Sequence, residues 1–396
     1  MTKKRYTTML ESHWLSQLLT VGFAISFVAL SFVFFTSQVS ATGDQTNPSE
    51  RRSVNNQTAS DQVRKTNPSP CAEALEHHTI CESANKQALE LMRSGSLTAI
   101  TVVQDVRTGA LLAFGASDPK SLNVTTGLSP LSTVKLLLAA SWWDHELPEE
   151  FQTSDGTRVS IQEMLVGGSD TAGRQVASKL RTSTGIQPVL ADLSRYGFPF
   201  GRQLPVDQHY WASIEPALKD QLLPETSFNS LNLSTPEEWD DSLSIGEARF
   251  NITALHLSRF LQAVGNGGVM LAPTARVHAT EKDDSLGLVN STRVLKEATA
   301  LKLQAAMKDA VQRGNANTIA SILSDTNWTI GGKTGTGPGE VGPQSDGWFA
   351  GLVFDRLGHA RFTVATYVKH GGKGSGNAAR VSAELARFII GENPKS

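Results

Sequence analysis

Strand-like segments stand at both ends of the main body of the chain, and helical patterns fill the middle. Residues 97–105 are rich in β-branched side chains and precede a glycine-containing turn and residues 110–115, which predicts a β-hairpin. Three more strands are predicted at 328–336, 347–355 and 359–370, before a closing helix. This order predicts an α+β fold, an antiparallel sheet built from an N-terminal hairpin and three C-terminal strands. Terminal helices flank the sheet, and a mostly helical subdomain is inserted.

Charge and cysteine content exclude several classes of function. The formal net charge of −2 over 396 residues gives no basic surface for DNA or RNA, so we expect no nucleic-acid partner. Two cysteines are too few for a disulfide-stapled scaffold or a four-thiolate metal site. A hydrophobic content of 39% suits an ordinary globular chain.

The N-terminal segment predicts export of everything that follows it. Residues 1–17 contain Lys3, Lys4 and Arg5, and residues 18–35 are apolar and uncharged. Basic residues before the span place residues 1–17 in the cytoplasm and the rest outside the cytoplasm, by the positive-inside rule. We expect a retained single-pass anchor in the cell membrane, because the apolar run is longer than a usual signal-peptide core. Cleavage after Ala41 is the alternative, and it also exports the chain.

A linker and one large domain follow the anchor. Residues 36–70 are rich in Ser, Thr, Asn, Gln and Pro and have no hydrophobic period, which predicts a flexible extracytoplasmic linker. Residues 71–393 form the predicted domain. Cys71 and Cys81 would share an oxidising compartment, where a disulfide is plausible. Such a bridge requires the chain between them to fold back, since a continuous helix would hold them about 15 Å apart. The sequence leaves this pairing open.

The first segment whose side chains could take part in catalysis is Ser132-Thr133-Val134-Lys135. Ser-x-x-Lys also occurs at 83–86 and at 117–120, but only Ser132 precedes an apolar helical run. Positions i and i+3 share a helix face, so Lys135 can reach the Ser132 hydroxyl. Burial or a second cation would lower the pKa of such a lysine and make it a base. The structural alternative is a helix-capping serine followed by a surface lysine.

Two further segments also contain side chains that could take part in catalysis. Ser169-Asp170-Thr171 precedes a predicted helix, where Ser169 can relay a proton or simply cap that helix. Lys333-Thr334-Gly335-Thr336 lies on a predicted strand, preceded by two glycines. Glycines in a strand often mark the close approach of another backbone, as an edge strand that receives an extended peptide requires. The alternative is a hairpin strand that ends in a glycine-rich turn.

The three segments together resemble the serine β-lactamase and penicillin-binding protein superfamily. The resemblance covers about residues 95–393. Within the superfamily, this part of the chain resembles a penicillin-binding protein transpeptidase domain. Other stretches that carry it are Thr101–Ala116, Ser129–Lys135, Ser244–Gly246, Asn266–Gly268 and Trp348–Gly351. The sequence departs from the family pattern at Thr171, where the family usually has Asn, and at Leu131, where it has Gly. The Thr171 hydroxyl offers one hydrogen bond fewer to a substrate amide than Asn would.

The resemblance implies a membrane-anchored D,D-transpeptidase or carboxypeptidase that acts on D-Ala-D-Ala stem peptides in peptidoglycan synthesis. Ser132 would be the nucleophile, Lys135 would take its proton, and Ser169 with Lys333 would pass a proton to the leaving group. The implied substrate-binding residues are Thr171, Thr334, Gly335 and Thr336. No metal or organic cofactor is implied. The implied partners are stem peptides, β-lactams, the inner-membrane bilayer and cell-wall synthesis proteins, with the catalytic domain in the periplasm.

Two other functions stay open at this stage. A serine β-lactamase shares acylation and adds fast deacylation, and Glu215–Leu218 resembles part of the segment that supplies a water-activating carboxylate in one β-lactamase class. Lys219 follows where that class has Asn. A membrane-tethered β-lactam sensor or wall-binding scaffold would be acylated once without turnover.

Overall fold

The computed structural model describes residues 69–120, 122, 124, 126–198, 236–247, 250–276, 291–338 and 342–391. The predicted anchor, the linker up to residue 68 and Glu215–Leu218 lie outside these residues. No helix in this described part is long and apolar enough to cross a membrane.

A five-stranded antiparallel sheet forms the centre of the domain, in the order β2-β1-β9-β8-β7. Its strands are β1 (Thr98–Asp105), β2 (Leu111–Ala116), β7 (Thr329–Gly337), β8 (Asp346–Phe354) and β9 (Ala360–Lys369). The N-terminal hairpin therefore joins the three C-terminal strands through β1 and β9, which confirms the predicted α+β architecture. This order leaves β7 at the edge of the sheet.

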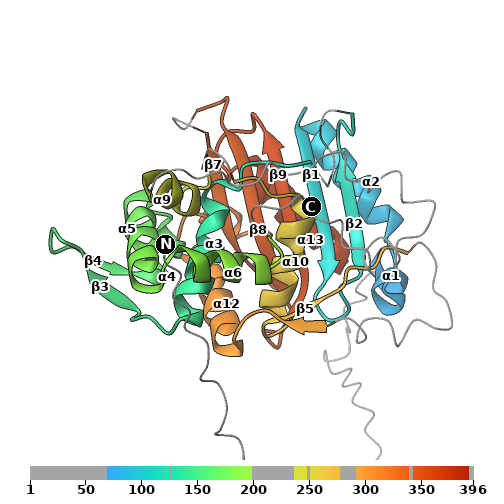
Figure 1. Ribbon diagram of the computed structural model, residues 1–396. Coiled ribbons are helices and arrows are strands. Elements are labelled where there is room, and N and C mark those ends of the chain that lie inside the picture. The colour runs from blue at the N-terminus through green and yellow to red at the C-terminus, as the bar shows by residue number, and fades with distance from the viewer. Residues whose placement is uncertain are drawn as a thin grey trace, which may run out of the picture. The chain divides into compact units, whose positions relative to one another are not determined.

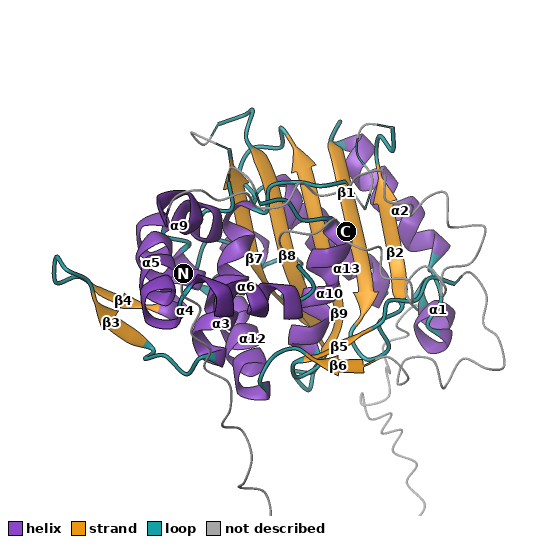
Figure 2. Cartoon of the chain, viewed as in Figure 1, coloured by secondary structure: helices purple, strands orange, loops and turns teal. Residues whose placement is uncertain are grey.

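Helices lie on both faces of the sheet and beyond one edge (Figure 1, Figure 2). α2 (Glu82–Ser94) and α13 (Asn377–Ile390) pack on one face, and α10 (Ala254–Gly265) and α12 (Glu297–Gln312) pack on the other. The other helices are α1 (Ala72–His77), η1 (Leu131–Thr133), α3 (Val134–Asp144), α4 (Ile161–Gly167), α5 (Asp170–Thr184), α6 (Ile186–Arg195), α9 (Pro236–Ser244) and η3 (Asn317–Ile319). Figure 1 shows α3, α4, α5 and α9 gathered beside β7.

Alternate residues of the sheet supply two separate cores. Trp348 and Leu352 on β8 pack with α10, whereas Phe349 and Val353 on the same strand pack with α13. This is the period-2 alternation of a strand covered on both faces. Two short antiparallel strand pairs were not predicted, β3 (Glu150–Gln152) with β4 (Arg158–Ser160) and β5 (Val269–Leu271) with β6 (Ser291–Arg293).

Cys71 and Cys81 form a disulfide with their Cα atoms 5.4 Å apart. The chain folds back between them because α1 ends at His78, whose φ of 55° lies in the left-handed region. The Thr79 N–H then donates to Ala74 O at 3.0 Å, which closes the turn. This break in the helix brings the two cysteines within bonding range.

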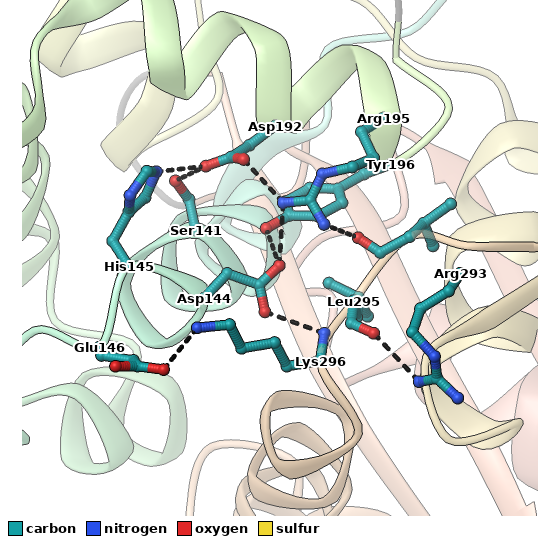
Figure 3. Close-up of polar contacts among 11 residues, drawn as sticks. Ser141, Asp144, His145, Glu146, Asp192, Arg195, Tyr196, Arg293, Leu295 and Lys296 are labelled. Carbon is teal, nitrogen blue, oxygen red and sulfur yellow. Dashed lines mark hydrogen bonds and ion pairs between the residues drawn. The ribbon is translucent and has the colours of Figure 1, made fainter. Parts of the chain in front are cut away.

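A buried polar cluster fixes the C-terminal end of α3 against α6 (Figure 3). Asp192 on α6 accepts hydrogen bonds from Ser141 Oγ at 2.6 Å and from Arg195 Nη2 at 2.7 Å. His145 Nε2 lies 2.8 Å from the Asp192 carboxylate. Because Ser141 is fully buried, its hydroxyl has a structural role. The cluster therefore fixes the C-terminal end of α3, and Ser132 lies just before the N-terminal end of the same helix.

Asp144, the last residue of α3, joins the same cluster to the chain before α12. Its carboxylate accepts hydrogen bonds from the Tyr196 hydroxyl at 2.9 Å, from Arg195 Nη2 at 3.0 Å and from the Lys296 backbone N–H at 3.1 Å. Burial and the neighbouring carboxylates raise the pKa of Tyr196, so its hydroxyl stays protonated and donates.

Asp192→Ala is expected to lower the free energy of unfolding by about 2–4 kcal/mol, because it leaves the buried Ser141 hydroxyl without its acceptor and removes a partner of His145 and of Arg195. Chemical denaturation measures this loss. The control is Glu146→Gln, which breaks an exposed pair with Lys296 and is expected to leave stability unchanged. An equal effect of the two substitutions would contradict the role given to the cluster.

Candidate active site

Ser132 lies in η1, immediately before α3, and Lys135 lies in the first turn of α3. Lys135 Nζ donates to Ser132 Oγ at 2.7 Å. Ser132 is partly exposed, whereas Lys135 is fully buried. The other two Ser-x-x-Lys segments start at Ser83, whose hydroxyl donates to Pro70 O, and at Ser117, whose hydroxyl accepts from Ala99 N–H. A buried lysine bonded to a reachable hydroxyl is therefore assembled at Ser132.

Two hydrogen bonds hold the chain around Ser132 in place. The Trp348 indole N–H donates to Ser129 O at 2.9 Å, and the Leu131 N–H donates to Gly246 O at 3.1 Å. Leu131 has a φ of 52°, a left-handed conformation that is costly for a branched side chain. Its burial in the core offsets this cost. Gly246 must lack a side chain, because a Cβ there would lie 2.2 Å from Leu131 O.

The Lys135 ammonium has two further partners. Its Nζ lies 2.5 Å from Asp170 Oδ1 and donates to Gly168 O at 3.1 Å. Burial lowers the pKa of Lys135, and Arg174 adds to this effect, whereas hydrogen bonding and charge attraction by Asp170 oppose it. A lowered pKa makes Lys135 a better proton acceptor near neutral pH than an exposed lysine.

Close packing of α5 against α3 makes the Lys135–Asp170 contact possible. Gly173 lies inside α5, where glycine costs about 1 kcal/mol relative to alanine. A Cβ at this position would lie 2.8 Å from Lys135 Cε. Gly173 therefore leaves the room that the Lys135 side chain occupies on its way to Asp170.

Lys333 brings a second buried amine to the same place from β7. It is 2% exposed, and its Nζ donates to Thr334 O at 2.9 Å. Gly168 lies between the two lysines, since its carbonyl accepts from Lys135 and a Cβ on it would lie 3.4 Å from Lys333 Nζ. Burial, followed by the positive charge of Lys135, lowers the pKa of Lys333 to about 7.

This arrangement suits nucleophilic acyl transfer. A reachable hydroxyl has a buried amine with lowered pKa at hydrogen-bond distance, and a second amine next to that base attracts anionic groups. The edge strand β7 offers backbone groups to an extended peptide. No cluster of three or more His, Cys, Asp or Glu side chains is placed to hold a metal ion in the part of the chain that the structure describes.

Comparison with known families and structures gives a family match in the C-terminal part of the chain and a fold match over most of it. Residues 226–390, which contain the Lys333–Thr336 segment, match the family model of the penicillin binding protein transpeptidase domain. The resemblance to a penicillin-binding protein transpeptidase domain is confirmed. A comparison with curated proteins found no match.

Solved structures of the same fold extend the similarity beyond the family match. A putative peptidoglycan glycosyltransferase from Atopobium parvulum has a TM-score of 0.58 at 20% identity, over 77% of this chain and 75% of that one. The transpeptidase domain of Burkholderia pseudomallei penicillin-binding protein 3 has a TM-score of 0.57 at 16% identity, over 83% and 95%. Penicillin-binding protein 3 of Mycobacterium tuberculosis, complexed with ampicillin, has a TM-score of 0.55 at 17% identity, over 78% and 75%. At these identities the likeness shows the fold.

The middle segment lies at the N-terminus of α5. Ser169 is exposed and caps α5, where its hydroxyl accepts from Ala172 N–H at 3.2 Å. Thr171 is also exposed, in the first turn of α5. Asp170 is the residue of this segment that contacts Lys135, and Gly168, which precedes the segment, lies next to Lys333. The proton relay by Ser169 and the substrate contact by Thr171 stay predictions.

The residues after Lys333 divide between the two faces of β7. Gly335 shares the face of Lys333, and a Cβ on it would lie 3.1 Å from Leu131 Cβ, so glycine permits the close approach of the Ser132 segment. Thr334 and Thr336 alternate to the other face, and Thr336 Oγ1 accepts from Gly374 N–H at 2.9 Å. Their part in holding a substrate carboxylate stays a prediction.

Sequence reasoning did not select Asp170. An acidic residue at a helix N-terminus is common, because the helix dipole favours it. The available signal was the glycine three residues later, which is unfavourable inside a helix unless another group packs against it.

The pKa of Lys333 predicts a loss of acylation on the alkaline side. Lys333 is a cation below about pH 7 and is neutral above it. Acylation by a penicillin with a free carboxylate is therefore expected to fall about tenfold between pH 7 and 9, whereas an exposed lysine would hold its charge to about pH 10. Stopped-flow acylation rates measure the profile.

The control for this profile is the methyl ester of the same penicillin, which has no carboxylate to be held. Its alkaline loss is expected to be absent. Parallel profiles for the acid and the ester would contradict the role of the Lys333 cation.

Proposed function

We propose that the chain is a membrane-anchored D,D-transpeptidase-like penicillin-binding protein that acts on peptidoglycan stem peptides ending in D-Ala-D-Ala. The contact that carries the proposal is the 2.7 Å hydrogen bond from buried Lys135 to the Ser132 hydroxyl, on a penicillin-binding transpeptidase fold. Carboxypeptidase activity differs only in the acceptor that attacks the acyl-enzyme.

The proposed reaction begins with attack of Ser132 Oγ on the carbonyl carbon of the penultimate D-Ala. The Ser132 proton moves to neutral Lys135 Nζ as the new C–O bond forms. The C–N bond to the last D-Ala then breaks, and the proton taken up by Lys135 passes by way of Ser169 and Lys333 to the leaving amine. An amine or water attacks the ester and restores the Ser132 hydroxyl. Backbone N–H groups near the tetrahedral oxygen would lower this barrier by about 3–4 kcal/mol for each donor.

The proposed ligands also include β-lactams, whose strained amide is opened by the same serine attack. Complexes of the similar Mycobacterium tuberculosis protein with ampicillin and with aztreonam support this choice. The buried Lys333 cation next to Lys135 offers a counterion for the carboxylate of a penicillin or of a terminal D-Ala.

The proposed location is the periplasmic face of the cell membrane, with residues 18–35 as anchor, 36–70 as linker and 71–393 as catalytic domain. Cell-wall synthesis proteins are the proposed protein partners. A reporter fused after Pro70 should be active outside the cytoplasm, and the N-terminus of the mature protein should begin before the apolar span. A mature protein that begins at Thr42 would replace the anchor by a signal peptide.

A time course with a fluorescent penicillin tests the function. Long-lived label on the wild-type chain supports the penicillin-binding protein. Label that is rapidly lost with release of hydrolysed penicillin identifies a β-lactamase, and absence of label overturns both.

A further inference from the structure

Asp170 is the acidic side chain that touches the reacting pair. Its Oδ1 lies 2.5 Å from Lys135 Nζ, and Ser132 Oγ donates to the same oxygen at 3.5 Å. The Asp170 side chain is 57% exposed, whereas the Lys135 side chain is fully buried. A carboxylate open to solvent therefore stands beside the nucleophile.

The neighbours of Asp170 in sequence do not share its position. Ser169 uses its hydroxyl to cap α5, and Thr171 is exposed with no described contact to Ser132 or Lys135. The position of Gly168, next to Lys333, supplies no side chain. Among the side chains from this part of α5, the one that borders the nucleophile is thus an anion.

An ionised carboxylate only accepts hydrogen bonds, and it has about four lone-pair sites. Lys135 and Ser132 both meet one oxygen of Asp170, so the exposed remainder of the carboxylate is free to meet an incoming ligand. A reacting carbonyl carbon must come within about 3–3.5 Å of Ser132 Oγ. Groups next to that carbonyl then lie within a few ångströms of Asp170.

We propose that Asp170 determines which acyl donors react at Ser132, by favouring those that present an N–H or a cationic group beside the reacting carbonyl and disfavouring those that present an anion there. This inference rests on the proposed acylation of Ser132. It narrows the substrate class to donors whose substituent beside the reacting carbonyl carries an amine or an amide N–H.

Other charged side chains lie around the site. Arg174 on α5 pairs with Asp241 on α9 at 2.7 Å, and its charge lowers the pKa of Lys135. Lys333 approaches from β7. Of these groups, Asp170 is the acid in contact with both Ser132 and Lys135, so its removal changes the local charge most directly.

The test uses two penicillins of opposite side-chain charge. Ampicillin carries an ammonium group on the side-chain carbon next to the amide, and carbenicillin carries a carboxylate on the corresponding carbon. Second-order acylation rates are measured for both at about pH 6, where an α-amino group is protonated. The ratio of the two rates does not depend on the folded fraction of the protein.

Wild type is expected to react faster with ampicillin, and Asp170→Asn is expected to lower the ampicillin-to-carbenicillin ratio about tenfold. The estimate takes a few-fold effect for each charge at several ångströms in water. The difference between wild type and Asp170→Asn should shrink as salt is added. Asparagine keeps the size of the side chain and an acceptor for Lys135, so the change tests charge rather than packing.

Glu146→Gln is the matched control, because it removes one carboxylate at the far end of α3, and it is expected to leave the ratio unchanged. Equal ratios in wild type and Asp170→Asn, with both proteins labelled, would overturn the inference and leave the proposed function intact. A ratio that responds to Thr171→Asn but not to Asp170→Asn would also overturn it and would restore Thr171 as the contact residue. Absence of labelling in every protein would overturn the proposed function and the inference together.

Discussion

Ser132→Ala is expected to abolish covalent labelling by a fluorescent penicillin. The substitution removes the oxygen that forms the acyl bond, so no slower version of the same reaction remains. The buried Lys135 keeps Asp170 and Gly168 O as partners, which should leave the fold intact. Labelling on a gel, with the melting temperature measured on the same sample, separates lost chemistry from lost structure.

Ser117→Ala is the matched control for this prediction, because Ser117 also begins a Ser-x-x-Lys segment. Its hydroxyl accepts from Ala99 N–H, and the variant should label like wild type. Label that persists in Ser132→Ala at the wild-type level would show that another residue is the nucleophile.

The sheet could be predicted from the sequence because its strands have strong local signals. Strand β8 has apolar residues on both of its faces, such as Trp348 on one and Phe349 on the other, as a strand covered by helices on both sides requires. The short strands β3, β4 and β6 have no such pattern. β3 contains Glu150, Phe151 and Gln152, and only its pairing partner makes it a strand.

The contact between Ser132 and Lys135 could also be predicted, since the two residues are three positions apart in consecutive helical turns, η1 and α3, and their contact needs no information about the rest of the fold. The middle segment could not be predicted in the same way. Ser169, Asp170 and Thr171 are all good N-cap residues, so propensity does not decide where α5 begins. A shift of one residue in that start rotates the side chains by about 100° and exchanges which of them faces Lys135.

The disulfide depended on a similar local choice. Cys71 and Cys81 could pair only if the helix between them stopped, and no glycine or proline marks the stop at His78. A left-handed residue at a helix C-terminus is usually Gly or Asn, so local propensity does not predict one at His78.

Lys135→Met is expected to slow acylation by about 10²- to 10⁴-fold, the usual range for loss of a general base. Methionine is an unbranched side chain that suits the buried space but cannot accept a proton. The Asp170 carboxylate left behind is more than half exposed, so water can solvate it and the fold should survive. Because the lost group acts on the chemical step, the rate constant of acylation should fall, with little change in the dissociation constant for the non-covalent complex.

Lys120→Met is the matched control, because Lys120 is the exposed lysine of the Ser-x-x-Lys segment that begins at Ser117. Its acylation rate should equal that of wild type. A Lys135→Met variant that acylates within tenfold of wild type would mean that Lys135 is not the base. The Asp170 carboxylate, to which Ser132 Oγ already donates at 3.5 Å, would then be the next acceptor to test for the Ser132 proton. The 2.7 Å contact of Lys135 with Ser132 Oγ, against 3.5 Å for Asp170, is the physical reason for expecting the larger loss at Lys135.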